Sequence, residues 1–261
     1  MEYTIVTGAC GGLGGAFVQE LAEKGEPMLL LGRNISRLAD LRVKLCAKYG
    51  VEPLLYELDL TDEKARGRFC EYLAENRIMV KRLINVAGAD VQKPFVDYTQ
   101  EKLAFQTRVN FEGAASLCLA VFAYKAKTLE IINVSSVSGV YPMPYFAVYS
   151  ATKRALWSFS VALREEWKGR GVKVTAVLPG AIPTREDIKE QIQGQGLWGK
   201  MAACSPAFVA KKSLKAVSKN KRTYIPGFWN KVMYFSTKLL PLSWKLKFIA
   251  KRWSKIEKDA F

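Results

Sequence analysis

The sequence predicts an α/β fold: a single domain built as a three-layer, doubly wound parallel sheet. Short apolar runs alternate with longer amphipathic runs along most of the 261 residues. Strands and helices that alternate in this way form right-handed βαβ units, whose helices cover both faces of the sheet. A chain of this length with 49% hydrophobic residues can also bury one substantial core.

The predicted elements follow this alternation in order. Short runs filled by aliphatic residues predict strands at 3–7, 28–31, 53–58, 82–86, 129–134 and 172–178. Longer runs in which charged residues recur predict helices at 13–24, 35–48, 62–76, 99–125, 147–168 and 206–219. A doubly wound sheet binds its ligand beyond the carboxyl ends of the strands, so the residues of the site should follow those ends.

The domain is expected to span residues 1–226, and a tail to span residues 227–261. A flexible stretch from Gly194 to Gly199 follows Pro179-Gly180. It suits a mobile substrate lid at about 181–205, although the composition fits an ordinary surface loop equally well.

Composition excludes several classes of site. The chain has no histidine, which removes the imidazole base, the Ser-His-Asp triad and most zinc sites, so we expect no metal. Five scattered cysteines without a Cys-x-x-Cys pair predict reduced thiols in a cytoplasmic protein. The first predicted strand starts at once, so we expect no signal peptide.

The net charge of +16 is concentrated near the carboxyl end. Residues 211–261 hold 14 basic and 2 acidic side chains, and the rest of the chain holds 26 and 22. Aromatic residues alternate with lysines through 228–253, and Pro241 divides this stretch. We expect two short helices that contact a membrane surface peripherally. The alternatives are a substrate lid, a subunit contact and a nucleic-acid contact, and of these we do not expect nucleic acid.

A glycine-rich turn, Thr7-Gly8-Ala9-Cys10-Gly11-Gly12-Leu13-Gly14, links the first strand to the first helix. Glycine lets the backbone approach a ligand closely, and the amino end of a helix offers unpaired N–H groups to a pyrophosphate. The spacing is neither G-x-G-x-x-G nor that of a P-loop. A purely structural turn is the alternative.

Tyr149 and Lys153 stand four residues apart in a predicted helix, so they share one face. A nearby ammonium group favours the phenolate, which predicts a lowered pKa for Tyr149. Tyr149 would then serve as a general acid or base near neutral pH.

Taken together, these motifs resemble the short-chain dehydrogenase/reductase family, whose sheet is of the Rossmann type. The resemblance covers about residues 3–225, and Ile225-Pro226-Gly227 with the tail resembles a lipid- and hydroxysteroid-directed branch of the family. The family implies a catalytic set of Asn110, Ser136, Tyr149 and Lys153, with Ser136 and Tyr149 contacting substrate. It implies a cofactor-binding set of Thr7, Gly8, Cys10, Gly11, Gly12, Leu13, Gly14, Arg33, Asn34, Asp59, Leu60, Asn85, Ala87, Gly88, Asn110, Tyr149, Lys153, Pro179, Gly180, Ile182 and Thr184.

The resemblance also implies a role for each catalytic residue. Tyr149 would protonate a substrate carbonyl oxygen while a hydride arrives from a nicotinamide. Ser136 would hydrogen-bond the same oxygen. Lys153 would lower the pKa of Tyr149 and hold the nicotinamide ribose, and Asn110 would hold a water that links the lysine to solvent.

Arg33 indicates which nicotinamide cofactor is used. An acidic residue at the end of the second strand would bind ribose hydroxyls and repel a 2′-phosphate. This chain has Gly32-Arg33-Asn34 there, and a guanidinium suits phosphate geometry. We therefore expect NADPH in preference to NADH.

The substrate is expected to be lipophilic. Residues 141–146 are mostly apolar or aromatic and would form one wall of the site, unless they only close the core. The leading hypothesis is NADPH-dependent reduction of a steroid-like or long-chain ketone. Reduction of a 3-oxoacyl thioester on an acyl carrier is the enzyme alternative, and an NADPH-binding regulator is the alternative without catalysis. Helices 99–125 and 147–168 pair subunits in related enzymes, which implies a homo-dimer or homo-tetramer.

Overall fold

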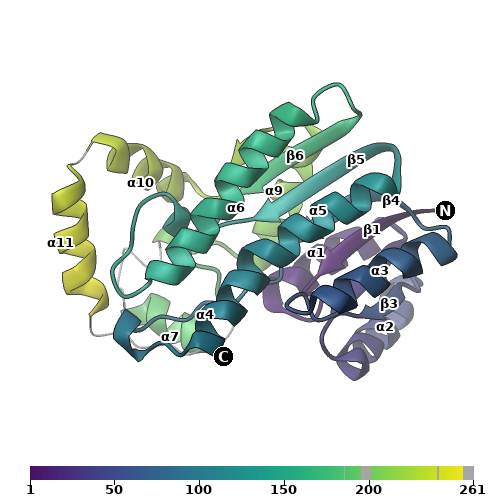
Figure 1. Cartoon of the computed structure of the whole chain (residues 1–261), viewed down its shortest axis with the longest axis horizontal. Coiled ribbons are helices and arrows are strands. Elements are labelled where there is room, and N and C mark those ends of the chain that lie inside the picture. The colour runs from purple at the N-terminus through teal and green to yellow at the C-terminus, as the bar shows by residue number, and fades with distance from the viewer. Residues whose placement is uncertain (185, 195–200, 240, 255–261) are drawn as a thin grey trace.

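A seven-stranded sheet, parallel throughout, forms the centre of the protein (Figure 1). The computed structural model describes residues 1–184, 186–194, 201–239 and 241–254. The strand order is β3-β2-β1-β4-β5-β6-β7, which is the doubly wound arrangement that the sequence predicts. The strands are β1 (Glu2–Thr7), β2 (Met28–Gly32), β3 (Leu54–Glu57), β4 (Met79–Asn85), β5 (Lys125–Val134), β6 (Val172–Val177) and β7 (Thr223–Tyr224).

Helices cover both faces of this sheet. The helices of the described residues are α1 (Gly12–Ala22), α2 (Ile35–Tyr49), α3 (Glu63–Glu75), α4 (Gln100–Thr107), α5 (Gly113–Ala123), α6 (Ala147–Glu166), α7 (Glu186–Gly194), α9 (Pro206–Ser218), α10 (Phe228–Leu239) and α11 (Leu242–Trp253). Three shorter turns of helix are η1 (Phe95–Asp97), η2 (Arg108–Glu112) and η3 (Val137–Gly139).

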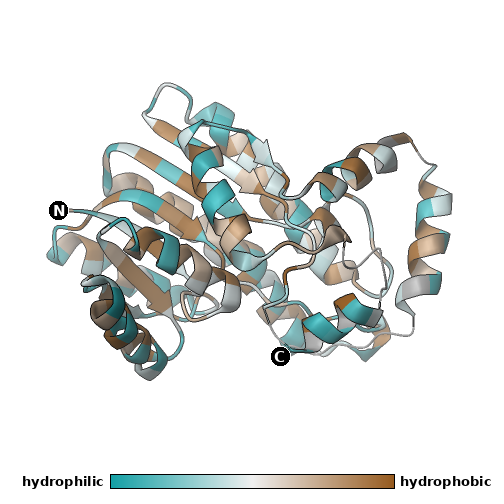
Figure 2. Ribbon diagram, turned by 180° about the vertical axis from the view of Figure 1, so that it is seen from behind, coloured by the Kyte–Doolittle hydropathy of each residue, from teal (hydrophilic) through white to brown (hydrophobic). Residues whose placement is uncertain are grey.

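Two apolar clusters, one on each face of the sheet, form the core. Val6 and Phe17 belong to the cluster beneath α1 and α9, whereas Ile5 and Phe69 belong to the cluster beneath α3 and α5. Successive side chains of a strand point to opposite faces, so neighbouring residues of β1 enter different clusters. Figure 2 shows the consequence, with hydrophobic strands inside and hydrophilic positions along the outer helices. The expected three-layer fold is confirmed.

Three features differ from the sequence prediction. The helix expected at 99–125 is divided into α4 and α5 by η2, a π-helical turn, and β5 already begins at Lys125. A π-turn occupies a single turn of helix, which is too short for the apolar periodicity of the sequence to reveal it. The short edge strand β7 was not predicted. Of the lid expected at 181–205, α7 is described, whereas residues 185 and 195–200 lie outside the described part of the chain.

The tail forms two helices on either side of Pro241, and these extend beyond the sheet in Figure 1. Asn230 on α10 anchors them, because its Nδ2 donates hydrogen bonds to Ala202 O at 3.0 Å and to Pro226 O at 2.8 Å. Asn230 is fully buried. Within the described residues, no helix combines the length and apolar character that crossing a membrane requires.

Candidate active site

A cavity of about 1520 Å³ lies at the carboxyl ends of the strands. It begins beside Arg33 and Asn34, passes the glycine turn, and ends between Tyr149 and helix α11. This is the edge where a doubly wound sheet binds ligands. Of the residues expected from the sequence to form the site, all but Asn85 and Asn110 line the cavity.

The glycine turn is too tightly packed for larger residues. Gly8 has φ 62°, a left-handed conformation that favours glycine. A Cβ on Gly14 would overlap Gly8 O, and one on Gly12 would lie 2.5 Å from the Cβ of Thr184. The cavity is therefore lined by bare backbone at the amino end of α1, as a pyrophosphate requires.

Thr7 joins this turn to the loop that follows β4. Its Oγ1 accepts hydrogen bonds from the backbone N–H groups of Val86 at 3.0 Å and Ala87 at 3.1 Å, and donates to Ile84 O at 3.4 Å. The threonine is 1% exposed. It thus fixes the separation of the two loops between which a dinucleotide would lie.

Arg33 and Arg37 place positive charge at one end of the cavity. The Arg33 guanidinium lies 5.5 Å from the centroid of the Phe105 ring, and Arg37 Nη2 donates to Cys10 O at 3.4 Å. Asn34 caps α2 by accepting from Arg37 N at 2.9 Å, which places both arginines at the start of the helix. Asp59, the acidic residue nearest this end among the described lining residues, accepts from Thr61.

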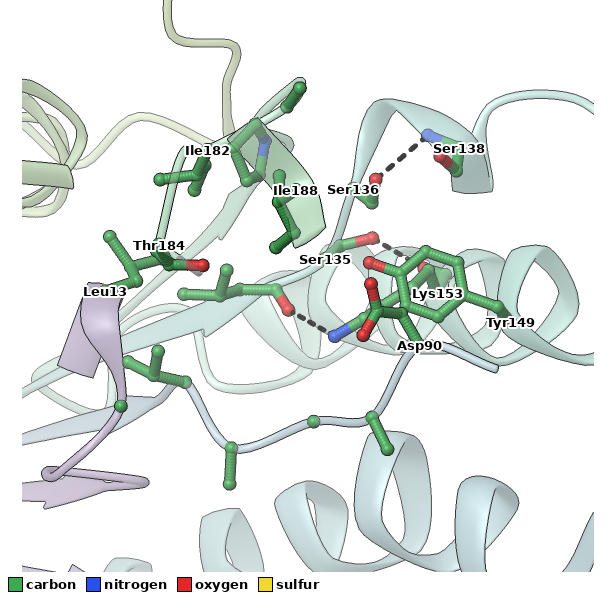
Figure 3. A pocket seen from close by; sticks show the side chains of 18 of the residues that line it. Leu13, Asp90, Ser135, Ser136, Ser138, Tyr149, Lys153, Ile182, Thr184 and Ile188 are labelled. Atoms are coloured by element: carbon green, nitrogen blue, oxygen red, sulfur yellow. Dashed lines mark hydrogen bonds between the residues drawn. The ribbon is translucent and has the colours of Figure 1, made fainter. Parts of the chain in front are cut away.

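The reactive side chains meet at the other end of the cavity (Figure 3). Tyr149 and Lys153 project from α6, and Ser136 follows β5, where its Oγ accepts from Ser138 N at 3.1 Å. Lys153 Nζ donates to Val134 O at 3.0 Å, and Ser135 Oγ donates to Lys153 O at 2.6 Å. The predicted trio of Ser136, Tyr149 and Lys153 is therefore brought together.

Burial controls the protonation of this pair. It raises the pKa of Tyr149 well above the ordinary value; the charge of Asp90 raises it further, and a hydrogen bond with Ser136 lowers it by less. Burial lowers the pKa of Lys153 to about 8, against the opposing effect of Asp90. The expected lowering of the Tyr149 pKa by Lys153 is therefore wrong for this structure, because desolvation of the phenolate is the largest effect and the charge of Asp90 adds to it.

Asn110 lies in η2 and is 1% exposed. Its Oδ1 accepts from Ala89 N at 2.8 Å, while its Nδ2 donates to Ala89 O at 2.9 Å and to Thr152 Oγ1 at 3.2 Å. Asn110 thus clamps the loop after β4 onto α6, and it does not line the cavity.

Asn85, expected to contact cofactor, also lies outside the cavity. Its Nδ2 donates to Asn133 Oδ1 at 2.8 Å, and Asn133 Nδ2 donates to Ser160 Oγ at 2.9 Å. These buried polar groups link β4, β5 and α6. The structure therefore places Asn85 in the scaffold between β4 and β5 and not in the lining of the cavity.

Sequence reasoning missed several residues that line the cavity. The tail contributes Met233, Ser236, Trp244, Lys245, Phe248, Ile249 and Trp253. Trp253 stacks on Phe146 with 6.0 Å between ring centroids, and Phe146 stacks on Tyr149 at 4.3 Å. Of the wall expected at 141–146, Tyr141, Met143 and Phe146 line the cavity. Asp90 was also missed, although its position two residues after Asn-Val-Ala-Gly was a usable signal.

The sequence matches known proteins over most of its length. Residues 2–193 match the family model described as short chain dehydrogenase. A very-long-chain 3-oxoacyl-CoA reductase from Bos taurus is 31% identical over 230 residues, which is 85% of this chain and 70% of that protein. A sulfoacetaldehyde reductase from Chromohalobacter salexigens is 33% identical over 187 residues, which is 70% of this chain and 73% of that protein.

Solved structures agree with this relationship. A short-chain dehydrogenase from Sphingobium yanoikuyae in complex with NADPH superposes with a TM-score of 0.74 at 25% identity, covering 92% of this chain and 95% of that one. A 7beta-hydroxysteroid dehydrogenase gives a TM-score of 0.85 at 22% identity, covering 95% and 96%, which supports the fold. The chain belongs to the short-chain dehydrogenase family and is an NAD(P)-dependent oxidoreductase that acts on the CH–OH/C=O pair.

Proposed function

We propose that this enzyme reduces the carbonyl group of a lipophilic substrate, steroid-like or a long-chain ketone, with NADPH. The observation that carries the proposal is the meeting of Ser136, Tyr149 and Lys153 at an apolar end of one cavity. Tyr141, Met143 and Phe146 surround this end together with Phe248 and Ile249 of the tail. Apolar walls around a few convergent polar groups are typical of sites for lipophilic ligands.

The residues present fit a nicotinamide dinucleotide. A side chain at Gly12 would clash with Thr184 and one at Gly14 with the backbone of Gly8, so these glycines keep the turn compact where it lines the cavity. Gly8 to Gly14 would hold the pyrophosphate, Arg33 the adenosine end, and Pro179 to Thr184 the nicotinamide. When bound, the cofactor would supply a hydride to the carbonyl carbon.

Tyr149 is the proton donor in this proposal. Its raised pKa keeps the phenol protonated at neutral pH, which suits a general acid in the direction of reduction. Ser136 Oγ accepts from Ser138 N, which leaves its hydroxyl hydrogen available to donate to the substrate oxygen, where negative charge develops. Lys153 uses one N–H to hold Val134 O and has two others with which to bind ribose hydroxyls.

Preference for NADPH rests on Arg33 and Arg37 at the adenosine end. Arg33→Asp should shift the ratio of kcat/KM from NADPH towards NADH by on the order of a hundredfold, because a phosphate contact becomes a repulsion. Lys44→Asp, an exposed change on α2, is the control. An unchanged cofactor ratio in the Arg33 variant would refute the assignment.

Reduction of a 3-oxoacyl thioester is the second candidate. The relative from Bos taurus is named for such a reaction, and Lys245 brings positive charge to the cavity where an anionic carrier group would lie. Turnover of carrier-bound but not free ketones would favour this candidate. A regulator that only binds NADPH is less well supported, since Ser136, Tyr149 and Lys153 are all present at the cavity.

The direct test is oxidation of NADPH and NADH with a panel of carbonyl compounds. The panel contains a steroid ketone, a long-chain ketone, a 3-oxoacyl thioester and a small sugar. The proposal expects NADPH-dependent turnover of a lipophilic member. Turnover of the sugar alone would contradict the proposed substrate class.

The outer side of the tail supports a peripheral membrane contact through 228–253. Phe228 is 70% exposed, Phe235 61% and Leu239 87%, and 211–254 contains no acidic residue. Exposed aromatic residues beside lysines suit the headgroup region of anionic lipid. Flotation with phosphatidylserine vesicles tests this contact, and a protein that floats with neither anionic nor neutral vesicles would contradict it.

We further propose a homo-dimer or homo-tetramer that pairs through α5 and α6. Leu119 on α5 is 73% exposed, as expected for a side chain that a second subunit covers. Light scattering on the purified protein measures the mass directly, and a monomer at micromolar concentration would contradict this proposal.

A further inference from the structure

Asp90 lies at the reactive end of the cavity, on a loop that hydrogen bonds hold on both sides. Both of its neighbours are buried and held: Ala89 by Asn110, as described above, and Val91 by Tyr98, whose hydroxyl donates to Val91 O at 3.0 Å. Gln106 Nε2 also donates to Ala89 O at 3.2 Å. A loop fixed on both sides presents Asp90 to the cavity in a defined place.

The carboxylate of Asp90 faces the catalytic pair. Figure 3 shows it on the same side of the cavity as Tyr149 and Lys153. Its charge contributes to the pKa of both groups, which places it within electrostatic reach of each. The loop is also close to the lysine, because a Cβ on Gly88 would lie 3.2 Å from Lys153 Nζ.

The other charges of the cavity are differently placed. Asp59 is the second acidic residue among the described lining residues, and it lies at the Arg33 end. Lys245 lines the cavity from α11, and the Lys153 ammonium and the Asp90 carboxylate both lie at the reactive end. Without Asp90, Lys153 would present a positive charge next to the position of the substrate carbonyl.

We propose that Asp90 is a specificity-determining residue that rejects substrates with a negative charge next to the reacting carbonyl. The inference rests on the proposed function, because it concerns the carbonyl substrate of that site. Asp90 offsets the attraction of an adjacent anion to Lys153 and repels the anion directly. A neutral ketone, or one whose anionic group lies far from the carbonyl, is not affected. The sulfoacetaldehyde reductase relative is named for a substrate that this rule would exclude.

A matched pair of substrates tests the rule: 2-oxooctanoate, with a carboxylate beside the ketone, and its neutral methyl ester. The wild type should prefer the ester. Asp90→Asn should reduce the ester-to-acid ratio of kcat/KM by on the order of tenfold to a hundredfold, the size expected for removing one charge at short range. Asp90→Glu, which keeps the charge, should retain most of the preference. An unchanged ratio in Asp90→Asn would overturn the proposal.

Asp97→Asn is the matched control, because Asp97 lies farther along the same loop, is exposed and does not line the cavity. Its ester-to-acid ratio should equal that of the wild type, and an equal shift in both variants would contradict a specific role for Asp90.

A binding measurement distinguishes failure of this inference from failure of the proposed reaction. Trp244 and Trp253 line the cavity, so quenching of tryptophan fluorescence reports ligand binding without turnover. In the presence of NADP⁺, 2-oxooctanoate should bind more tightly to Asp90→Asn than to the wild type, whereas the ester should not. A gain in affinity of Asp90→Asn for the acid alone supports the rule, even if neither compound is reduced. In that case only the proposed function fails. Equal affinities in both proteins would refute the rule.

Discussion

Replacing Asn110 by alanine should weaken the protein and the site together. The change removes two hydrogen bonds to Ala89, at 2.8 and 2.9 Å, and one to Thr152 at 3.2 Å. Ala89 O keeps its bond from Gln106, but Ala89 N–H is left buried and unpaired. An unsatisfied buried donor costs about 1–3 kcal/mol, and the other lost bonds about 1 kcal/mol each. The expected loss in the free energy of unfolding is therefore roughly 3–5 kcal/mol.

Urea unfolding followed by circular dichroism measures this loss, and Asn76→Ala is the matched control. Asn76 makes one exposed hydrogen bond, from Nδ2 to Tyr72 O at 2.9 Å, and its loss should cost under about 0.5 kcal/mol. Released from its clamp, the loop that carries Asp90 should also bind substrate less well. A loss below about 1 kcal/mol for Asn110→Ala would refute the reasoning that the clamp fixes this loop.

Three further predictions follow from the cavity. Gly14→Ala should weaken NADPH binding at least about tenfold in calorimetry, because the new Cβ overlaps Gly8 O. Gly15→Ala is the control, because its new Cβ meets its nearest atom only at 3.7 Å and should be tolerated. Equal affinities of the two variants for NADPH would contradict a role of the glycine turn in binding. Trp253→Ala should raise KM for a lipophilic ketone by roughly three- to tenfold with little change in kcat, because it removes the stack on Phe146. Trp229 does not line the cavity, so Trp229→Ala should leave KM unchanged. The kcat/KM for reduction should fall as pH rises through about 8, because burial lowers the pKa of Lys153 to about 8 and the ammonium form is lost above that value. A pH profile that is flat to about pH 10 would contradict this prediction.

The sequence allowed most of the fold to be predicted, for reasons visible in particular elements. β2 and the carboxyl-terminal halves of β1 and β4 are buried on both faces, and the apolar run in β2 is unambiguous. The carboxyl ends of parallel strands share one edge of the sheet. For this reason the turn after β1 and Ser136 after β5 line the same cavity, although they are far apart in sequence. The prediction that Tyr149 and Lys153 share one face required only the helical repeat, because they stand four residues apart.

Other features depend on packing that no local pattern records. The π-turn η2 places Asn110, and a single turn is too short for the periodicity of the sequence to reveal. The tail was expected at a membrane surface, yet its inner side lines the cavity, because Asn230 ties α10 to residues around Ala202 and Pro226. The pKa of Tyr149 depends on burial by Phe146 and its surroundings, which the spacing of a lysine cannot indicate.

The most direct test of the central account is Tyr149→Phe, assayed for NADPH-dependent reduction of a lipophilic ketone and for NADPH binding. The account predicts that kcat falls by at least about a thousandfold while the affinity for NADPH stays within about threefold, because only the proton donor is removed. Tyr49→Phe, which changes a tyrosine at the end of α2 outside the cavity, should match the wild type in both measurements. Turnover by Tyr149→Phe close to that of the wild type would contradict the account.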